Sequence, residues 1–144
     1  MSSKSSRIDG LLADFAELPG FNRYYAGFFR CFNAQLYYEA HDVLEEIWLP
    51  MRGQAQARFY QGLIQMAGAF VHLQKQRLGP AARLFALALA NFEGYPAHHA
   101  GIDLDAIRQI CRHHRQAVID SGATINPWSK EHAPQLALPA QELR

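Results

Sequence analysis

Proline and glycine divide this sequence into segments in which apolar residues recur at helical spacing. The breaks fall at Pro19-Gly20, Pro50, Gly79-Pro80, and Gly94 with Pro96. Proline and glycine at the ends of periodic segments are typical of helix termini. No stretch alternates apolar and polar residues with a period of two, which is the pattern of a half-buried strand. The chain is therefore predicted to be all-α.

The same breaks indicate how the helices are arranged. Helices are expected over about residues 8–18, 22–32, 37–49, 55–78, 81–92 and 103–120, with Gly79 capping the fourth. Short connections favour antiparallel neighbours, so we expect a single-domain bundle of about five to six antiparallel helices, paired as helical hairpins, without a sheet. Residues 1–7 are expected to be a disordered lead, residues 8–120 the bundle domain, and residues 121–144 an irregular proline-containing tail packed on the body through Trp128.

Composition and charge exclude several classes of protein. The chain has 144 residues, 49% hydrophobic and 19% charged, which is enough to bury a core and rules out a wholly disordered chain. A net charge of +1 gives no global attraction to nucleic acid or an anionic membrane. The longest apolar run, Leu84–Ala90, is too short to span a bilayer. We expect a soluble cytoplasmic protein without a membrane partner, in which Cys31 and Cys111 are reduced and buried.

The segment Tyr37–Trp48 places polar residues inside an apolar helix face. At 100° per residue, its members Tyr37, His41, Leu44, Glu45 and Trp48 share an arc of about 80°. A histidine and a carboxylate four residues apart can touch, and such a pair can poise a base or supply two metal ligands. We therefore expect His41 to be mostly buried and bonded to Glu45 or to the long helix. The opposite face is expected to be solvated; it carries Glu39, Asp42 and Glu46.

A second polar line runs along the long helix expected over residues 55–78. Gln61, Gln65, Gly68 and His72 fall within an arc of about 60°. A buried amide without a partner costs about 1–3 kcal/mol, so the glutamines need partners, and the first stripe is the simplest one. Gly68 would let a backbone or a ligand come close. The two stripes form either a structural hydrogen-bond network or a binding, metal or catalytic site.

The stripes supply the candidate site residues. The candidates for catalysis are His41, Glu45 and His72, and those for binding are Tyr37, Trp48, Gln61 and Gln65. No metal or cofactor is expected, because glutamine is a poor transition-metal ligand and no zincin, P-loop, dinucleotide or paired-cysteine motif is present. The basic last helix is expected to be an ordinary solvated surface; it carries Arg108, Arg112, His113, His114 and Arg115.

Taken together, these motifs resemble the bacterial and plastid family known as domain of unknown function 309. The likeness rests on Phe32-Asn33, Glu39–Glu45 with Trp48, Gln61–Gln65 with Ala67, His72, and Gly79–Leu84. The resemblance covers roughly residues 21–119 and implies a small all-helical fold of antiparallel hairpins with no assigned activity. Asp42 stands where the family usually has glutamate. Gln35 stands where a turn glycine is common, so the bend before Tyr37 is expected to differ.

Two main hypotheses for the function follow. The first is an interaction or scaffold module that presents a groove to an unknown protein or small molecule, or forms a homodimer through the aromatic residues of the second helix. The second is a metal-dependent or acid–base enzyme, hydrolase-like, using His41, Glu45 and His72 in a helix-lined cleft. Nucleic-acid binding through the last helix has the least support, because the net charge is close to zero. The sequence favours the first hypothesis and assigns no reaction.

Overall fold

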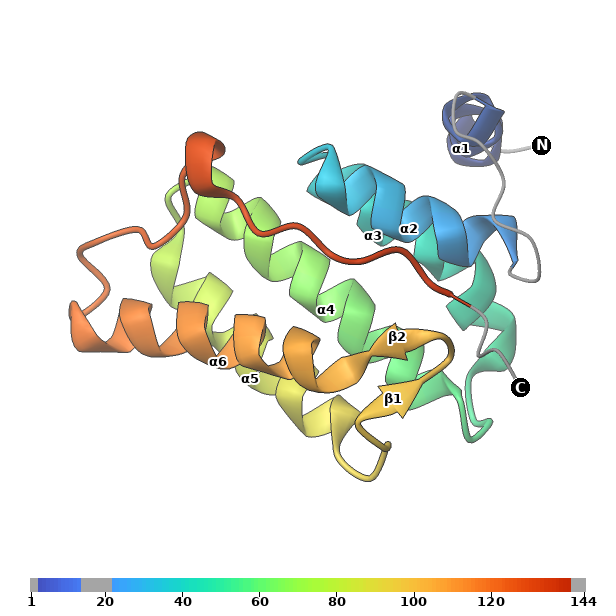
Figure 1. Cartoon of the computed structure of the whole chain (residues 1–144). Helices are drawn as coiled ribbons and strands as arrows, with labels where there is room; N and C mark the ends of the chain where they lie inside the picture. The colour runs from blue at the N-terminus through green and yellow to red at the C-terminus, as the bar shows by residue number, and fades with distance from the viewer. Residues whose placement is uncertain (1–2, 14–21, 141–144) are drawn as a thin grey trace.

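The computed structural model describes residues 3–13 and 22–140 (Figure 1). These residues form the α-helices α1 (Ser3–Ala13), α2 (Arg23–Asn33), α3 (Tyr37–Trp48), α4 (Ala57–Gln74), α5 (Leu78–Phe92) and α6 (Leu104–Asp120). The 3-10 turn η1 (Leu49–Met51) continues α3, and η2 (Lys130–His132) lies in the C-terminal segment. Within the described ranges, the β structure is limited to β1 (His98–His99) paired antiparallel with β2 (Ile102–Asp103). The predicted all-α class is therefore confirmed.

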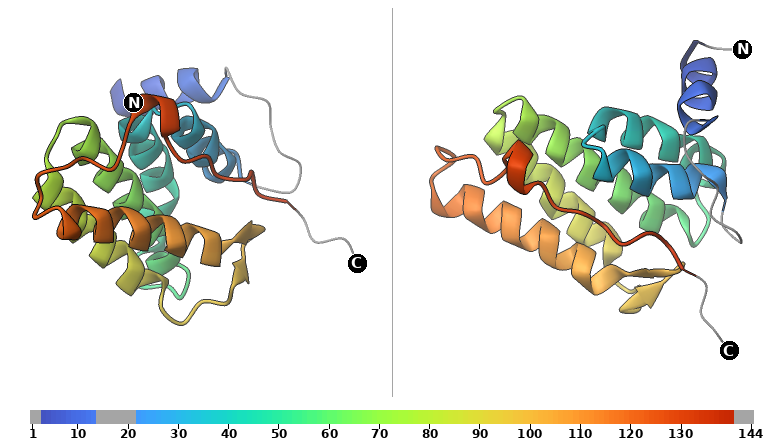
Figure 2. Two further views of the ribbon diagram at one scale, coloured as in Figure 1. Left: turned by 60° about the vertical axis from the view of Figure 1, so that its left-hand side comes forward. Right: turned by 45° about the horizontal axis from the view of Figure 1, so that its top comes forward.

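The helices from α2 to α6 pack in chain order, with α4 at the centre. α2 contacts α3, α3 contacts α4, α4 contacts α5, and α5 contacts α6. In Figures 1 and 2, α4 lies between the α2–α3 hairpin and the α5–α6 pair. Its sequence explains this place, because Phe59, Leu63, Met66, Phe70 and Leu73 form one fully buried face of the helix. Ala67 and Ala69, on either side of that face, are fully buried as well. None of the described helices is long and apolar enough to cross a bilayer.

The aromatic residues of α2 form part of the core. Phe28, Phe29 and Phe32 have no exposed surface. The ring of Phe32 packs edge-to-face against Tyr37, at a centroid distance of 4.9 Å, and against Phe70, at 5.2 Å. These rings are buried within one chain, so they do not provide the dimer surface that the sequence suggested for this helix.

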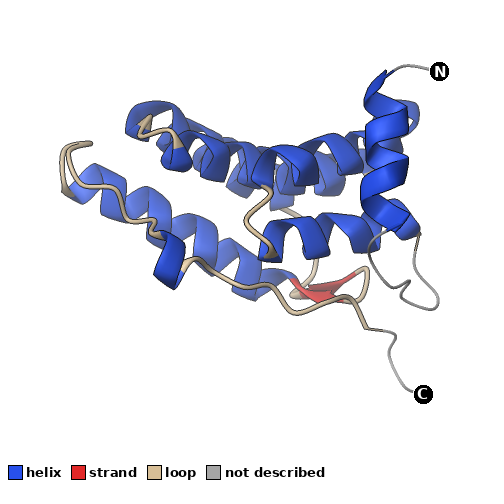
Figure 3. Ribbon diagram, turned by 90° about the horizontal axis from the view of Figure 1, so that it is seen from above, coloured by secondary structure: helices blue, strands red, loops and turns tan. Residues whose placement is uncertain are grey.

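Helix α1 lies across α2 and α3 and covers part of the face that was expected to be solvated (Figure 3). It docks through Ile8 and Leu12, and a Cβ on Gly27 would lie 2.1 Å from a methyl group of Leu12. Arg7 donates to the carboxylate of Asp42, whose exposure is 5%. The prediction of a solvated Asp42 was wrong, because an element distant in sequence packs over it. Helix α1 begins at Ser3, earlier than expected, and residues 14–18 of the predicted first helix lie outside the described residues.

The connection between α4 and α5 differs from the sequence prediction. Helix α4 ends at Gln74 instead of near Leu78, and Gln76 adopts a left-handed conformation with φ of +59°. The backbone amide of Arg77 donates to the carbonyl of His72 at 2.8 Å, which closes the turn. Gly79 lies in the first turn of α5 and is not a C-cap. As a result, Lys75 and Arg77 lie in a short connection at the end of α4.

The C-terminal segment crosses α4 as an irregular strap between α2 and α6 (Figures 1 and 2). The indole Nε1 of Trp128 donates to the hydroxyl of Tyr37 at 3.1 Å, so the contact expected of this tryptophan is present. The side chain of Asn33 bonds both the amide and the carbonyl of Leu136. Both cysteines are free and buried, and burial raises the pKa of each to about 12.

Candidate functional site

A cleft of about 320 Å³ lies among α3, α4 and α5. Helix α3 contributes Tyr38 and His41. Helix α4, the connection after it and helix α5 contribute Ile64, Gln65, Gly68, Val71, His72, Lys75, Arg77 and Leu84. Ligand pockets commonly measure about 300–1,000 Å³ and combine apolar walls with a few polar groups. This cleft is at the small end of that range.

The sequence of α4 explains why space remains at this place. Gly68 has no side chain, and a Cβ added there would lie 3.3 Å from a methyl group of Leu84 on α5. A larger residue would project into the gap between the helices, so glycine keeps the cleft open. Ile64, Val71 and Leu84 form its apolar wall.

His41 lies at the cleft with its ring held by carboxylates of its own helix. Its Nδ1 is 3.2 Å from Oδ1 of Asp42 and 3.6 Å from Oε1 of Glu45. The ring also stacks near Tyr38, with centroids 6.2 Å apart. The side chain is 32% exposed, so it is less buried than expected. The hydrogen-bond partner of Nδ1 is Asp42 and not, as predicted, Glu45 or the long helix, and Glu45 lies beside the ring at an ion-pair distance.

Gln65 is held by α5 and not by the α3 stripe. Its Oε1 accepts a hydrogen bond from Nδ2 of Asn91 at 2.6 Å. The hydrogen bonds described for His41 and Gln65 therefore do not link the two polar stripes to each other, as the sequence had suggested. His41 of the first stripe and Gln65, Gly68 and His72 of the second line a common cavity instead of forming a closed network.

His72 lies in the cleft among cationic groups. Its Nδ1 is buried and has no hydrogen-bond partner. Burial lowers the pKa of His72, and the positive charges of Arg77, Lys75 and Arg83 lower it further. A neutral imidazole with an unpartnered nitrogen can accept a hydrogen bond or, after protonation, donate one.

The structure divides the predicted site residues into two groups. His41, Gln65 and His72 line the cleft. Tyr37, Glu45, Trp48 and Gln61 do not. Tyr37 is buried in the core and stacks on Phe70, with centroids 5.2 Å apart, and its pKa is raised by burial. Trp48 lies beside the guanidinium of Arg52, which is 5.9 Å from its ring centroid.

Some cleft residues were missed by the sequence reasoning. Tyr38, Lys75 and Arg77 were not among the candidates. The two basic residues were missed because the long helix was expected to continue to Leu78, which placed them on an ordinary helix surface. Their position directly after His72 in the sequence was the available signal.

One group of side chains has the donor atoms of a metal site. Ligand atoms of His41, Asp42 and Glu45 lie within 4.8 Å of one another. The guanidinium of Arg7, however, is bonded to Asp42, and its positive charge opposes a cation at the same carboxylate. The arrangement fits a histidine held by two carboxylates better than it fits a metal centre.

The part of the chain that lines the cleft is also the part that matches known proteins. Residues 25–84 match the model of a family described as Domain of unknown function (DUF309). An uncharacterized protein of Bacillus subtilis (strain 168), YpuF, is 38% identical over 50 residues, which are 35% of this chain. The chain spans only 29% of the length of that relative. The match of the family model includes all ten residues that line the cleft. The resemblance drawn from the sequence is thus confirmed over residues 25–84, which match the DUF309 family model.

Proposed function

We propose that the protein is a binding module for a small molecule, with its site in the cleft among α3, α4 and α5. The observation that carries this proposal is a cavity of about 320 Å³ that combines an apolar wall with a few polar side chains. Apolar surface supplies binding energy in such a site, and a few polar groups set the orientation of the ligand. His41, Gln65 and His72 are the polar groups of this kind.

The hydrogen bonding supports a binding site over a purely structural network. Polar side chains that serve helix packing are normally satisfied by protein partners. Here the Nδ1 of His72 has none, and Gln65 bonds Asn91 at the cleft instead of the opposite stripe. His72 at the cleft therefore lacks the protein partner that a structural network would give it.

A fragment screen with a blocked variant tests the proposal. Backbone amide signals of ¹⁵N-labelled protein are followed while small fragments are added, and shifts are expected at Gln65, Gly68 and His72. Gly68→Leu places a side chain in the cleft and is expected to abolish these shifts. Its Cβ would lie 3.3 Å from a methyl group of Leu84, so the free energy of unfolding of each variant is measured alongside the shifts. Gly10→Leu is the matched control, since a Cβ at Gly10 meets nothing within 4 Å and the residue lies on α1. Fragments that bind equally to the Gly68→Leu variant, or a screen without shifts at these amides, would refute the proposal.

A second candidate is an acid–base enzyme that uses the same cleft. The observation that favours it is His41, whose Nδ1 lies close to the carboxylates of Asp42 and Glu45. A carboxylate can fix the tautomer of a histidine and stabilise its protonated form, as a general base requires. Once a ligand is known, prolonged incubation followed by NMR would show whether it is converted. If the ligand is converted, and if His41→Gln abolishes this conversion without abolishing binding, the protein is an enzyme. If the ligand stays unchanged, the protein is a binding module only.

A further inference from the structure

One end of the cleft is cationic, and this determines the class of ligand that it suits. We infer that the cleft binds a small organic anion, with its carboxylate or phosphate against Lys75, Arg77 and His72 and its apolar part against Ile64, Val71 and Leu84. This inference rests on the proposed function and adds the chemistry of the ligand.

The first observation is that the cations at the cleft have no carboxylate partner. In the described part of the chain, Arg7, Arg23 and Arg108 each pair with an aspartate. Lys75 and Arg77 have no ion pair or hydrogen bond from their side chains within those same residues. An unpaired guanidinium and an unpaired ammonium at one cavity can together make charge-assisted hydrogen bonds to an oxyanion.

The second observation is the charge of the lining. None of the ten lining residues is acidic. The carboxylates of Asp42 and Glu45 contact His41, but neither of them lines the cleft. The overall net charge is only +1, so the positive potential is a local feature of this cavity and not a property of the whole surface.

The third observation concerns the backbone at the same end. Arg77 is the N-cap of α5 and has no capping hydrogen bond from its side chain. The amino end of a helix carries a partial positive charge and free amide groups. The helix dipole of α5 therefore adds to the attraction that Lys75 and Arg77 exert on an anion.

His72 supplies a group whose titration reports on the anion. Lys75, Arg77 and Arg83 surround it with positive charge, while Tyr38 and His41 of α3 and Leu84 of α5 line the same cavity. An anion bound among these groups favours the protonated imidazole. Binding is therefore expected to raise the pKa of His72, whereas binding of a neutral molecule is not.

Four probes separate the contributions of charge and apolar surface. Phenyl phosphate and benzoate carry both, benzyl alcohol carries only the apolar ring, and inorganic phosphate carries only the charge. We expect benzoate and phenyl phosphate to bind at least about tenfold more tightly than the other two, as measured by shifts of the cleft amides. One tenfold step corresponds to about 1.4 kcal/mol.

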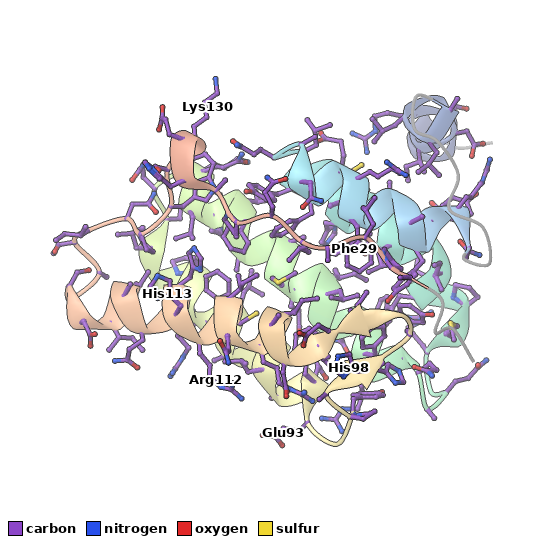
Figure 4. The ribbon with its side chains drawn as sticks, viewed as in Figure 1. Phe29, Glu93, His98, Arg112, His113 and Lys130 are labelled. Atoms are coloured by element: carbon purple, nitrogen blue, oxygen red, sulfur yellow. The ribbon has the colours of Figure 1, made fainter. Side chains whose placement is uncertain are left out.

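A pair of matched double variants tests the residues. Lys75→Gln/Arg77→Gln is expected to weaken both aromatic anions by about tenfold or more and to leave benzyl alcohol unchanged. Arg112→Gln/Lys130→Gln removes the same charge from exposed positions on α6 and η2 (Figure 4) that do not line the cleft, and is expected to have no effect on binding. An equal loss of binding in both double variants would show that only the net charge matters and would overturn the inference.

The remaining outcomes distinguish this inference from the proposed function. If benzyl alcohol binds the cleft as tightly as the anions, the cleft is a small-molecule site, but the assignment of an anion is wrong. If inorganic phosphate binds as tightly as phenyl phosphate, the apolar wall does not contribute to binding, and the assignment of an organic anion is wrong. If none of the four probes shifts the cleft amides, the inference fails, and the fragment screen decides separately whether the cleft binds anything. A pKa of His72 that benzoate leaves unchanged would refute its contact with the anion.

Discussion

At Leu136 the strap formed by the C-terminal segment is attached to α2 through the side chain of Asn33, and replacing Asn33 should measure the strength of this attachment. Asn33, the last residue of α2, donates from Nδ2 to the carbonyl of Leu136 at 2.8 Å and accepts the amide of Leu136 on Oδ1 at 2.7 Å. The side chain thus pairs with an extended backbone as a neighbouring strand would. Asn33→Ala removes both bonds and leaves the two backbone groups of Leu136 without their partners.

The magnitude follows from the two bonds. Each hydrogen bond contributes about 0.5–1.5 kcal/mol net, so the loss is about 1–3 kcal/mol if the strap stays in place. Leu136 is 6% exposed, and full burial of a leucine side chain contributes about 1.5–3 kcal/mol, which keeps the strap from simply detaching. Asn33→Asp is expected to cost at least as much, because a carboxylate oxygen would face the carbonyl oxygen of Leu136.

Urea denaturation followed by circular dichroism measures the free energy of unfolding by linear extrapolation. Hydrogen exchange at the amide of Leu136 reports the local effect and is expected to accelerate in Asn33→Ala. Gln109→Ala, at an exposed position of α6, is the control and should leave both measurements unchanged. A free energy of unfolding within about 0.5 kcal/mol of the parent protein, with unchanged protection of Leu136, would refute the reasoning.

Three further predictions concern single residues. Gln65→Leu is expected to lower the free energy of unfolding by less than about 1 kcal/mol, because Asn91 is partly exposed and water can replace its partner; a loss above about 2 kcal/mol would indicate a buried network instead. Gln35 has a left-handed backbone with φ of +62°, and its side chain donates to the carbonyl of Lys130. Both Gln35→Ala and Gln35→Gly lose this bond, but only glycine adopts the left-handed conformation without strain, so the alanine variant should be about 1 kcal/mol less stable in thermal unfolding. Equal stabilities of the two variants would contradict this. Burial lowers the pKa of His114 below 6.5, so as the pH falls the unfolded chain binds the proton first, and stability should fall as the pH drops below about 6.5. His114→Phe should flatten this part of a plot of the urea midpoint against pH. An unchanged slope in the variant would refute the assignment.

His114 also shows how tertiary contacts change the meaning of a residue. In the sequence it stands beside His113 on a helix that carries several arginines, and it was grouped with a solvated basic face. In the structure it is buried, with its ring 5.0 Å from Phe70 and its Nδ1 2.8 Å from the carbonyl of Ile110. Helical periodicity gives the direction of a side chain, but not which neighbouring element lies in that direction.

The sequence alone determined the helical class and the approximate extent of most helices, and it revealed the resemblance to the DUF309 family. Those features depend on local causes, namely apolar spacing, helix-breaking residues and motifs whose spacing survives in a linear chain. It also indicated that His41, Gln65, Gly68 and His72 belong together, because polar residues on a mostly apolar face stand out without any structure.

Only the tertiary structure decided what fills the space between those residues. In the structure, α1 packs over Asp42, and Asn91 is the hydrogen-bond partner of Gln65. Helix α4 ends early enough for Lys75 and Arg77 to lie at the cleft. Each of these results depends on packing between elements distant in sequence or on a turn with a left-handed residue at Gln76. A linear pattern shows which face of a helix is polar, but whether that face meets a partner side chain, water or an open cavity depends on the packing of the whole chain.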